Sequence, residues 1–367
     1  MTCRTIVAFM ALLVTISIVS AGDWPLHRGN APQTGVSDEK LPAKMSIRWQ
    51  YKTKDSVEGA PAIVSGVVYV GSYDQHLHAI DLKTGQLKWK TKLGPIKASP
   101  AVKGDRVYIG DIDGKFYCLA TADGKIQWKF ETEAEITAAA NFAGDHVLIP
   151  SQDSTLYCLD SAGKKVWEFK TEGPIFGAVA VADEKTFVAG CDSQMHVIDV
   201  KTGKELGSVD LKGQTGAAVA VADGKLYVGT MTNQVLAVDL KKLKVDWEFE
   251  APKRKQAFFA SAAVTADLVI IGSRDNKVWA LDRKTGERKW DFLTENKVDG
   301  SAVVVGNRVF VGSSDKTFYI LDLATGAKLD DFALDGAIIG SPAIAGGCVV
   351  VGTDKGTVYC LGTLVGN

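Results

Sequence analysis

The chain has 367 residues, 46% of them apolar, and its 42 Lys and Arg residues nearly balance 43 Asp and Glu residues. A chain of this length and apolar content can bury a large core, and its balanced charge gives no general attraction to nucleic acid or to an anionic membrane. The 37 glycines outnumber the 10 prolines and are dispersed, which indicates many tight turns rather than a flexible linker. These features favour an all-β fold and predict no nucleic-acid partner.

The first 21 residues have the features of an export signal. Arg4 precedes an apolar run over residues 6–19, and the small residues Ser20 and Ala21 follow it. The run is shorter than the roughly 20 residues that a membrane-spanning helix needs. We expect cleavage after Ala21 and a periplasmic or secreted protein without a transmembrane segment, either a monomer or part of a complex; an uncleaved anchor is the alternative. Because Cys3 precedes the run, no lipoprotein anchor is predicted.

A short β-rich run that ends in a small residue recurs through the rest of the sequence. The eight copies end at Gly71, Gly110, Pro150, Ala189, Gly229, Gly272, Gly312 and Gly352, and successive ends are 39, 40, 39, 40, 43, 40 and 40 residues apart. Each period holds three further short β-rich runs between Gly, Asp and Asn turns. Four short strands in a period of about 40 residues are typical of a β-propeller blade.

The two ends of the repeat region complement each other. The last repeat stops after Val358–Leu361 without a Trp-bearing fourth strand, whereas Ile47–Tyr51 resembles the fourth strand at Val166–Phe169. An N-terminal strand that completes the last blade closes the ring and removes an exposed sheet edge. We therefore predict an eight-bladed β-propeller of four-stranded antiparallel blades over residues 46–367, after a signal peptide (1–21) and an N-terminal extension (22–45).

The repeat unit resembles a known one. The run Ala79–Gly85, with Trp89 four residues later, resembles the tryptophan-docking repeat of the pyrroloquinoline quinone (PQQ) dehydrogenases, which the outer-membrane assembly protein BamB shares. The resemblance extends from about Trp24 to the C-terminus, although Gly207 and Asp330 replace the Trp in two repeats. It implies that each Trp docks on the next blade and ties neighbouring sheets together. Six repeats keep this residue: Trp49, Trp89, Trp128, Trp167, Trp247 and Trp290.

The same resemblance implies an alternative function. In quinoprotein dehydrogenases PQQ lies at the propeller mouth with a Ca²⁺ ion, near a catalytic Asp and often a disulfide of adjacent cysteines, in a pocket built by long insertions. Here no two cysteines are adjacent, and the repeats differ in length by at most four residues. We therefore favour a scaffold with no catalytic residues and no cofactor. A PQQ- and Ca²⁺-dependent dehydrogenase, or a PQQ-binding protein, is the alternative.

Two groups of residues could bind a metal ion, but both are interpreted as structural. His76 and His78 alternate along a third strand, where His78 shares its position with Tyr117 and other aromatic residues. This column is interpreted as packing, so no metal site is predicted. The Asp residues of the preceding turns are interpreted as turn formers rather than Ca²⁺ ligands: Asp74, Asp113, Asp153, Asp192, Asp275 and Asp315.

Five cysteines remain after cleavage, so at least one thiol stays unpaired within the molecule. Cys118, Cys158 and Cys360 share one strand position and are predicted to be small core residues, because equivalent positions in neighbouring blades lie beyond the Cα separation of about 7 Å that a disulfide tolerates. The pairing of Cys191 and Cys348 stays open.

The longest period contains an unusual segment between blades five and six. Lys253, Arg254 and Lys255 are followed by Phe258 and Phe259, a combination that predicts a binding surface for an acidic peptide, a polysaccharide or a lipid head group. A solvated basic loop in front of an inner strand is the alternative. Loops expected on the same face add five candidates: Glu133, Glu135, Arg274, Lys297 and Asp299. The favoured function is an exported scaffold, BamB-like in architecture, that binds a protein or another macromolecule of the cell envelope.

Overall fold

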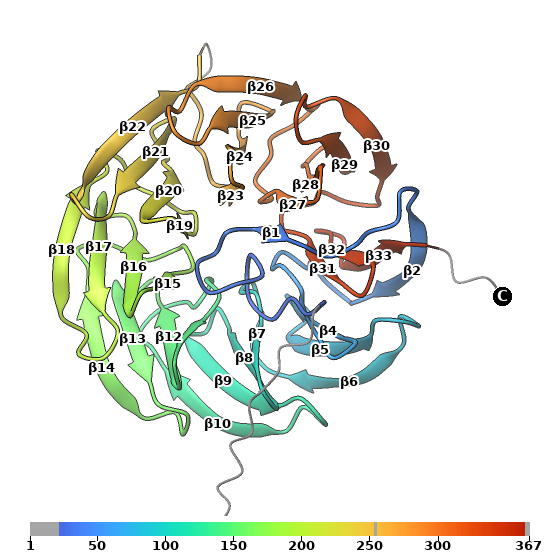
Figure 1. Ribbon diagram of the computed structural model, residues 1–367. Coiled ribbons are helices and arrows are strands. Elements are labelled where there is room, and N and C mark those ends of the chain that lie inside the picture. Colours follow the sequence, from blue (N-terminus) through green and yellow to red (C-terminus); the bar gives the residue numbers. More distant parts are fainter. Residues whose placement is uncertain (1–21, 253–254, 364–367) are drawn as a thin grey trace, which may run out of the picture.

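A computed structural model of the chain describes residues 22–252 and 255–363, so the expected signal peptide lies outside the described residues. Within the described ranges the regular elements are strands, which form eight sheets arranged radially around a central axis (Figure 1). The predicted eight-bladed β-propeller is therefore confirmed. No helix of this described part is long and apolar enough to cross a membrane.

The first four blades follow one another in chain order. Blade one contains β3 (Ala62–Val64), β4 (Val67–Ser72), β5 (His76–Asp81) and β6 (Leu87–Lys92). Blade two contains β7 (Ala101–Lys103), β8 (Arg106–Gly110), β9 (Lys115–Ala120) and β10 (Ile126–Glu131). Blade three contains β11 (Asn141–Ala143), β12 (His146–Pro150), β13 (Thr155–Leu159) and β14 (Lys165–Lys170). Blade four contains β15 (Ala180–Ala182), β16 (Lys185–Ala189), β17 (Gln194–Asp199) and β18 (Glu205–Asp210).

The last four blades include both contributions from the N-terminal region. Blade five contains β19 (Ala220–Ala222), β20 (Lys225–Gly229), β21 (Gln234–Asp239) and β22 (Lys244–Glu250). Blade six contains β23 (Ala263–Val264), β24 (Leu268–Ser273), β25 (Lys277–Asp282) and β26 (Arg288–Leu293). Blade seven contains β27 (Val303–Val305), β28 (Arg308–Gly312), β29 (Thr317–Asp322) and β30 (Lys328–Ala333), with β1 (Val36–Ser37) added beside β27. Blade eight contains β31 (Ala343–Ala345), β32 (Cys348–Gly352), β33 (Thr357–Gly362) and β2 (Ser46–Lys52).

The ring closes as the sequence predicts. Strand β2 pairs antiparallel with β33, and Trp49 lies opposite Cys360 in that pairing. The second strand of each blade is buried along nearly its whole length, whereas exposed residues recur along the fourth strands, as in β10 and β14. This contrast arises because the second and third strands pack between neighbouring sheets, while each fourth strand forms part of the outer wall. The charged side chains of these outer strands discourage pairing with other chains.

The six docking tryptophans tie each blade to the next. Each indole N–H donates to a backbone carbonyl of the following blade at 2.8–3.1 Å, as from Trp49 to Leu82 and from Trp89 to Thr121. The ring of Trp49 covers Gly85, whose φ is +72° and where a Cβ atom would lie 2.7 Å from the indole. Glycine at this turn therefore supplies both the positive φ and the space for the Trp.

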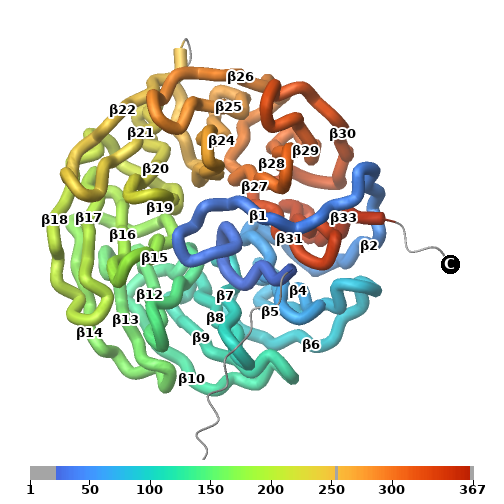
Figure 2. The backbone as a smooth tube through the Cα atoms, viewed as in Figure 1, coloured from blue at the N-terminus to red at the C-terminus, as the bar shows by residue number. Residues whose placement is uncertain are grey.

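The N-terminal extension lies across the centre of the ring (Figure 2). Trp24 bridges Ile63 of blade one through two backbone hydrogen bonds. Carbonyls of the extension then accept hydrogen bonds from the inner strands of six further blades: Pro25 from Val102, Ala31 from Asn141 and Val181, Pro32 from Val221, Thr34 from Val264 and Gly35 from Val304. Glu39 accepts from the Gly347 N–H of blade eight. The extension thus contacts all eight blades, in their order around the ring.

Arg28 fastens the middle of this extension. Its side chain is fully buried, and its guanidinium donates to the carbonyls of Ala262, Ser301 and Ala302 at the inner strands of blades six and seven. Burial lowers the pKa of Arg28 to about 9. Because three backbone acceptors from two blades converge on one side chain, Arg28 links the extension directly to the propeller. We call the region occupied by residues 23–39 the closed end of the channel.

Candidate functional site

A funnel lies at the other end of the central channel. Each inner strand runs along the axis, so the residues that precede it lie at one end and the turn that follows it lies at the other. The extension contacts the second residue of the inner strands and the following turns, as where Ser65 donates to Asp23. The funnel is lined by the segments that lead into the same strands. We call this end the open end.

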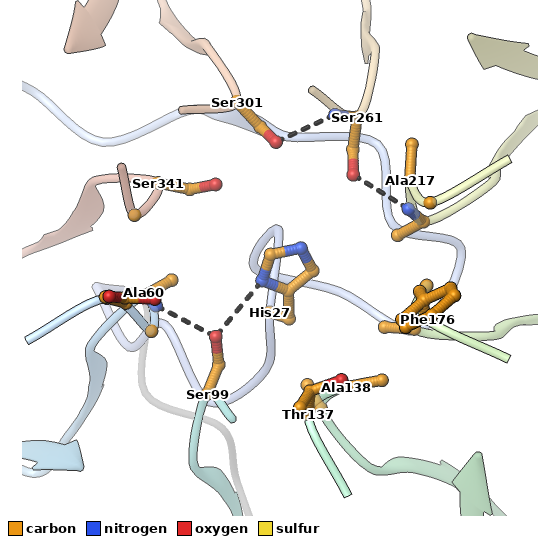
Figure 3. Close-up of a pocket in the computed structure, with 18 of the residues that line it drawn as sticks. His27, Ala60, Ser99, Thr137, Ala138, Phe176, Ala217, Ser261, Ser301 and Ser341 are labelled. Carbon is orange, nitrogen blue, oxygen red and sulfur yellow. Dashed lines mark hydrogen bonds between the residues drawn. The ribbon is translucent and has the colours of Figure 1, made fainter. Parts of the chain in front are cut away.

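Two layers of equivalent residues form the wall of the funnel, and Figure 3 labels members of both, such as Ser99 and Phe176. The inner layer is the residue two positions before each inner strand: Ala60, Ser99, Ala139, Ala178, Ala218, Ser261, Ser301 and Ser341. The outer layer is the residue four positions before each inner strand: Glu58, Lys97, Thr137, Phe176, Gly216, Phe259, Asp299 and Ile339. The inner layer is uniformly small, whereas the outer layer differs in chemistry from blade to blade. The inner part of the funnel has a volume of about 150 Å³, and the wider part toward the rim about 340 Å³.

The serines of the inner layer hold the wall together. Ser99 Oγ accepts the Ala60 N–H at 2.8 Å, and Ser301 Oγ accepts the Ser261 N–H at 2.8 Å. Ser261 Oγ accepts the Ala218 N–H of the preceding blade at 3.0 Å. These hydroxyls satisfy backbone donors of neighbouring blades, so their first role is to join the blades at the axis.

His27 of the extension forms the floor of the funnel. Its Nδ1 atom lies 3.4 Å from Ser99 Oγ (Figure 3). Burial, with a smaller effect from the charge of Arg28, lowers the pKa of His27 to about 3. The imidazole is therefore neutral near pH 7, and the floor presents a polar but uncharged group.

One side of the rim carries an ordered ion-pair network. The Arg274 guanidinium donates to both carboxylate oxygens of Asp299, at 2.8 and 3.1 Å, and Lys297 lies 2.9 Å from the same carboxylate. Burial raises the pKa of Asp299, but the hydrogen bonds and charges of Arg274 and Lys297 outweigh it and hold this pKa below its ordinary value. The guanidinium also lies over the Phe259 ring, 3.9 Å from its centroid. The rim therefore presents a fixed arginine stacked on an aromatic ring.

The rest of the rim is largely apolar. Phe176, Met231, Phe259 and Ile339 line the wider part of the funnel and are partly exposed. Lys97 lies 3.9 Å from Glu58, a looser pair than Arg274 and Asp299. The open end thus combines an apolar surface with paired charges, which is the composition of the anchoring regions of protein interfaces.

The sequence-predicted binding residues fall into several environments. Phe259, Arg274 and Asp299 line the funnel, and Lys297 lies beside Asp299. Glu135 accepts a hydrogen bond from Gln152 at 3.1 Å.

Four other candidates lie away from the funnel wall or cannot be placed. Glu133 contributes a backbone N–H to Asp153, and Lys255 pairs with Glu250 at 3.1 Å; neither lines the funnel. Lys253 and Arg254 lie outside the described residues.

Phe258 requires a correction. It was predicted to be a binding residue, but its side chain is fully buried and packs in the core against Gly229. Alternation along the segment that enters β23 turns Phe258 inward and Phe259 toward the channel. The outer-layer residues Lys97, Phe176 and Ile339 were not among the predicted binding residues. When the repeats are aligned on their inner strands, these residues fall at a position that varies between repeats, whereas the position two residues later is always Ala or Ser.

The third-strand column and the turn aspartates form pairs. Tyr157 and Tyr319 each donate a hydroxyl hydrogen bond to the turn Asp of their own blade, Asp153 and Asp315, at 2.8 Å. In blade two the acceptor is Asp111 rather than Asp113. Asp74, Asp153, Asp192, Asp275 and Asp315 also accept backbone N–H groups of their turns.

The residues of the open end do not fit PQQ and Ca²⁺. A quinone with three carboxylates needs several uncommitted cations, yet of the two cations among the described lining residues Arg274 is bound to Asp299 and Lys97 is close to Glu58. The inner part of the funnel, at about 150 Å³, is below the roughly 300–1,000 Å³ typical of small-molecule sites, and the wider part, at about 340 Å³, is at the lower end of that range. Of the two carboxylates among the described lining residues, Asp299 already has two cationic partners, and Glu58 lies 3.9 Å from Lys97.

Eight radial blades, docked tryptophans and a central channel define this class of protein as a β-propeller of PQQ-like repeats. The family described as outer membrane protein assembly factor BamB matches residues 42–96, 79–177, 122–206 and 293–367, which is more than half of the sequence. The chain belongs to this family.

Individual relatives agree with this assignment. A stretch of 40 residues is 45% identical to the outer membrane protein assembly factor BamB of Salmonella typhimurium, covering 11% of this chain and 10% of that protein. BamB from Moraxella catarrhalis has a similar structure, with a TM-score of 0.74 and 21% identity over 88% of this chain and 99% of that chain. The quinohemoprotein alcohol dehydrogenase from Comamonas testosteroni gives a TM-score of 0.82 at 15% identity, over 96% of this chain and 83% of that chain. At these identities the two structures share the fold alone.

Proposed function

We propose that this protein is a non-catalytic scaffold of the cell envelope that holds a protein partner at the open end of its channel. The observation that carries the proposal is the outer layer of the funnel, where one structurally equivalent position carries seven different residue types in eight blades above a uniformly small inner layer. Repeat scaffolds recognise partners through such variable positions on a constant framework. Membership of the BamB family supports a place in the envelope.

The chemistry of the rim favours a protein partner. Phe176, Phe259 and Met231 offer an apolar surface beside the ordered Arg274, and aromatic, Met and Arg residues are enriched at the centres of protein interfaces. The wider part of the funnel, about 340 Å³, can receive a protruding apolar side chain of a partner. The closed end directs such an insertion to one face, because residues 23–39 occupy the other.

A photoreactive amino acid placed at Phe176 tests this proposal in envelope extracts of the native host. We expect a discrete cross-linked protein from this position and none from a photoreactive residue at Leu87, which is 42% exposed on the outer wall. The variant Arg274→Glu should weaken the cross-link at least tenfold, whereas Arg288→Glu on the outer strand of blade six should leave it unchanged. Equal cross-linking from the funnel and the outer wall would contradict the proposal.

The dehydrogenase alternative has its own experiment. The chain is incubated with PQQ and Ca²⁺, and dye-linked oxidation of alcohols and of glucose is measured alongside quinone absorbance. We expect neither stoichiometric quinone binding nor turnover. Turnover that depends on both additions would replace the scaffold proposal with the enzymatic one.

A further inference from the structure

The seam where the ring closes, between blades eight and one, departs from the other seams at two adjoining places. Two residues after the docking Trp, β2 carries Tyr51, whereas five other outer strands carry Phe at this position: Phe130, Phe169, Phe249, Phe292 and Phe332. The third strand β5 begins with His76, whereas the equivalent residue elsewhere is Lys, Thr or Gln: Lys115, Thr155, Gln194, Gln234, Lys277, Thr317 and Thr357. His78 follows at the position of the aromatic column. At this seam a histidine pair of blade one thus meets Tyr51 of blade eight.

These side chains converge on the turn carboxylate of Asp74. His78 Nε2 lies 3.1 Å from both Asp74 oxygens, and His76 Nδ1 lies 3.4 Å from Asp74 Oδ1. One donor atom from each of the three residues lies within 4.8 Å of the other two. Metal–ligand bonds of about 2.0–2.1 Å in a tetrahedral site place neighbouring donor atoms about 3.3 Å apart. Two of the three donor separations are close to this value, and the third is at most 4.8 Å. His76 Nδ1 also lies 2.8 Å from the Asp74 backbone carbonyl, a contact that the bound ion would replace.

The surroundings of His78 suit a metal ligand. Tyr51 Oη lies 3.0 Å from His78 Nδ1, and the two rings meet edge to face. A hydroxyl both donates and accepts, so Tyr51 accepts an N–H from Nδ1 when the lone pair of Nε2 is needed for a metal. In metal sites the ring nitrogen of a histidine that does not bind the metal usually donates a hydrogen bond to a neighbouring residue, which fixes the orientation of the ring.

The three residues also provide an entry path. The Asp74 and His78 side chains are 3% and 2% exposed, whereas the His76 side chain is 23% exposed. An ion held here would have two buried ligands, one ligand at the surface, and a fourth position open to water. We propose that Asp74, His76 and His78 form a binding site for a divalent transition-metal ion of the Zn²⁺ class. Two imidazoles and one carboxylate also suit Co²⁺ and Ni²⁺.

Such an ion would act as a clamp on ring closure. Asp74 Oδ2 already accepts the backbone N–H of Lys54, just after the closing strand β2, and His78 contacts Tyr51 within β2. A metal bound to Asp74 and His78 would fix the turn of blade one and, through Tyr51, the strand that completes blade eight. The clamp would therefore join the two ends of the repeat array.

Blade four offers an internal control. His196 occupies the same column position as His78, but its ring nitrogens contact two carboxylates, Asp192 at 2.9 Å and Glu205 at 2.7 Å. The residue two positions earlier is Gln194 rather than a histidine. The described part of blade four thus has the column histidine without the second imidazole, and it should not bind the metal.

The test uses the tag-free chain after treatment with a chelator. Titration with Co²⁺, followed by its visible absorption, and with Zn²⁺, followed by calorimetry, should show one bound ion and a metal-dependent rise in melting temperature. His76→Gln and His78→Tyr install residues that other blades carry at the same positions, so both variants should fold and lose at least 100-fold in metal affinity. His196→Tyr should bind as the wild type does. Tyr51→Phe, which installs the residue that five other outer strands carry, should weaken binding about 10–100-fold.

Two results would overturn the proposal. One is the absence of stoichiometric Co²⁺ and Zn²⁺ binding by the folded wild-type chain. The other is wild-type affinity in both His76→Gln and His78→Tyr, which would place the bound ion elsewhere. Circular dichroism and melting of the metal-free variants confirm that each comparison is made between folded proteins.

Discussion

The closed and open ends of the channel are built on the same eight inner strands but use opposite physical strategies. At the closed end, the extension satisfies backbone donors of successive blades, and Arg28 is fully buried against three carbonyls. At the open end, the outer-layer side chains remain partly exposed, and their charges pair with one another as in Arg274 and Asp299. Burial and backbone hydrogen bonds to successive blades stabilise the first end. Exposed and varied side chains leave the second end available for recognition.

The two ends of the channel should differ in how well they tolerate amino-acid substitutions. The closed end depends on one segment that must match all eight blades at once, so a single alteration affects contacts with several sheets. Each outer-layer residue of the open end belongs to one blade. Substitutions should therefore be costly for stability at the closed end and costly for binding at the open end.

Among the substitutions at the closed end, the largest loss of stability is expected from Arg28→Met. Met retains much of the volume but leaves the carbonyls of Ala262, Ser301 and Ala302 without this donor, so the free energy of unfolding should fall by about 3 kcal/mol. Urea denaturation followed by tryptophan fluorescence measures the change. The control Arg288→Met removes an exposed arginine paired with Asp291, and it should change stability by less than about 0.5 kcal/mol. Equal losses in the two variants would mean that Arg28 does not fasten the extension.

The next effect is expected from Gly35→Ala. Gly35 has φ +65°, and a Cβ atom there would lie 2.0 Å from Arg28 Nη2. Gly347 has φ +71° with no atom within 4 Å of its virtual Cβ, so Gly347→Ala has the backbone strain without the collision. We expect a loss of roughly 1 kcal/mol for Gly347→Ala and about 2–3 kcal/mol for Gly35→Ala. Chemical denaturation of both variants under one condition separates the two contributions, and identical losses would contradict the packing of Arg28 against Gly35.

The closed end should also respond to acid. Burial, and to a smaller extent the charge of Arg28, lowers the pKa of His27 to about 3. As the pH falls below about 6.5, His27 therefore becomes protonated in the unfolded chain but stays neutral in the folded chain. Stability from His27 is therefore complete above pH 6.5 and is lost progressively as the pH falls toward 3. His27→Asn should show a shallower fall in melting temperature between pH 6.5 and 4 than the wild type. An unchanged slope would contradict this assignment.

His196 on blade four should give the opposite pH dependence of stability. Burial lowers its pKa, but the hydrogen bonds and charges of Asp192 and Glu205 outweigh this and raise it above the ordinary value. Its contribution is present below pH 6.5 and is lost as the pH rises through the raised value. His196→Gln should therefore lose more stability at pH 5 than at pH 9, the reverse of His27→Asn.

The fold could be predicted because its determinants repeat. The strand that ends at Gly71 and the docking Trp recur at a regular spacing along the sequence. The segment Ile47–Tyr51 supplies the strand that the last repeat lacks, and it pairs with β33 as expected. This regular spacing is too consistent to arise by chance. The path of the extension could not be predicted. Residues 22–45 have no repeat, and many of their hydrogen bonds to the blades are accepted by backbone carbonyls, which any residue carries.

The functional residues were only partly predictable for a related reason. Arg274 and Asp299 were found because charged loop residues are conspicuous, but their pairing depends on a turn of blade six and the segment leading into blade seven. His76 and His78 were interpreted separately from Asp74, since one belongs to a strand pattern and the other to a turn pattern. The sequence shows each pattern, whereas the distance between their side chains is a property of the folded blade.

The smallest loss of stability is expected from Phe259→Ala at the open end. The ring is partly exposed and contacts Arg274, so its removal should lower the free energy of unfolding by about 1 kcal/mol while weakening capture of the partner at the funnel. Its neighbour Phe258 is fully buried, and Phe258→Ala should cost about 3–5 kcal/mol because it leaves a cavity in the core between blades five and six. Denaturation and cross-linking measured together on both variants should therefore separate recognition from folding between adjacent residues. If Phe259→Ala lost as much stability as Phe258→Ala, the open end would be part of the structural core, and the difference between the two ends of the channel would disappear.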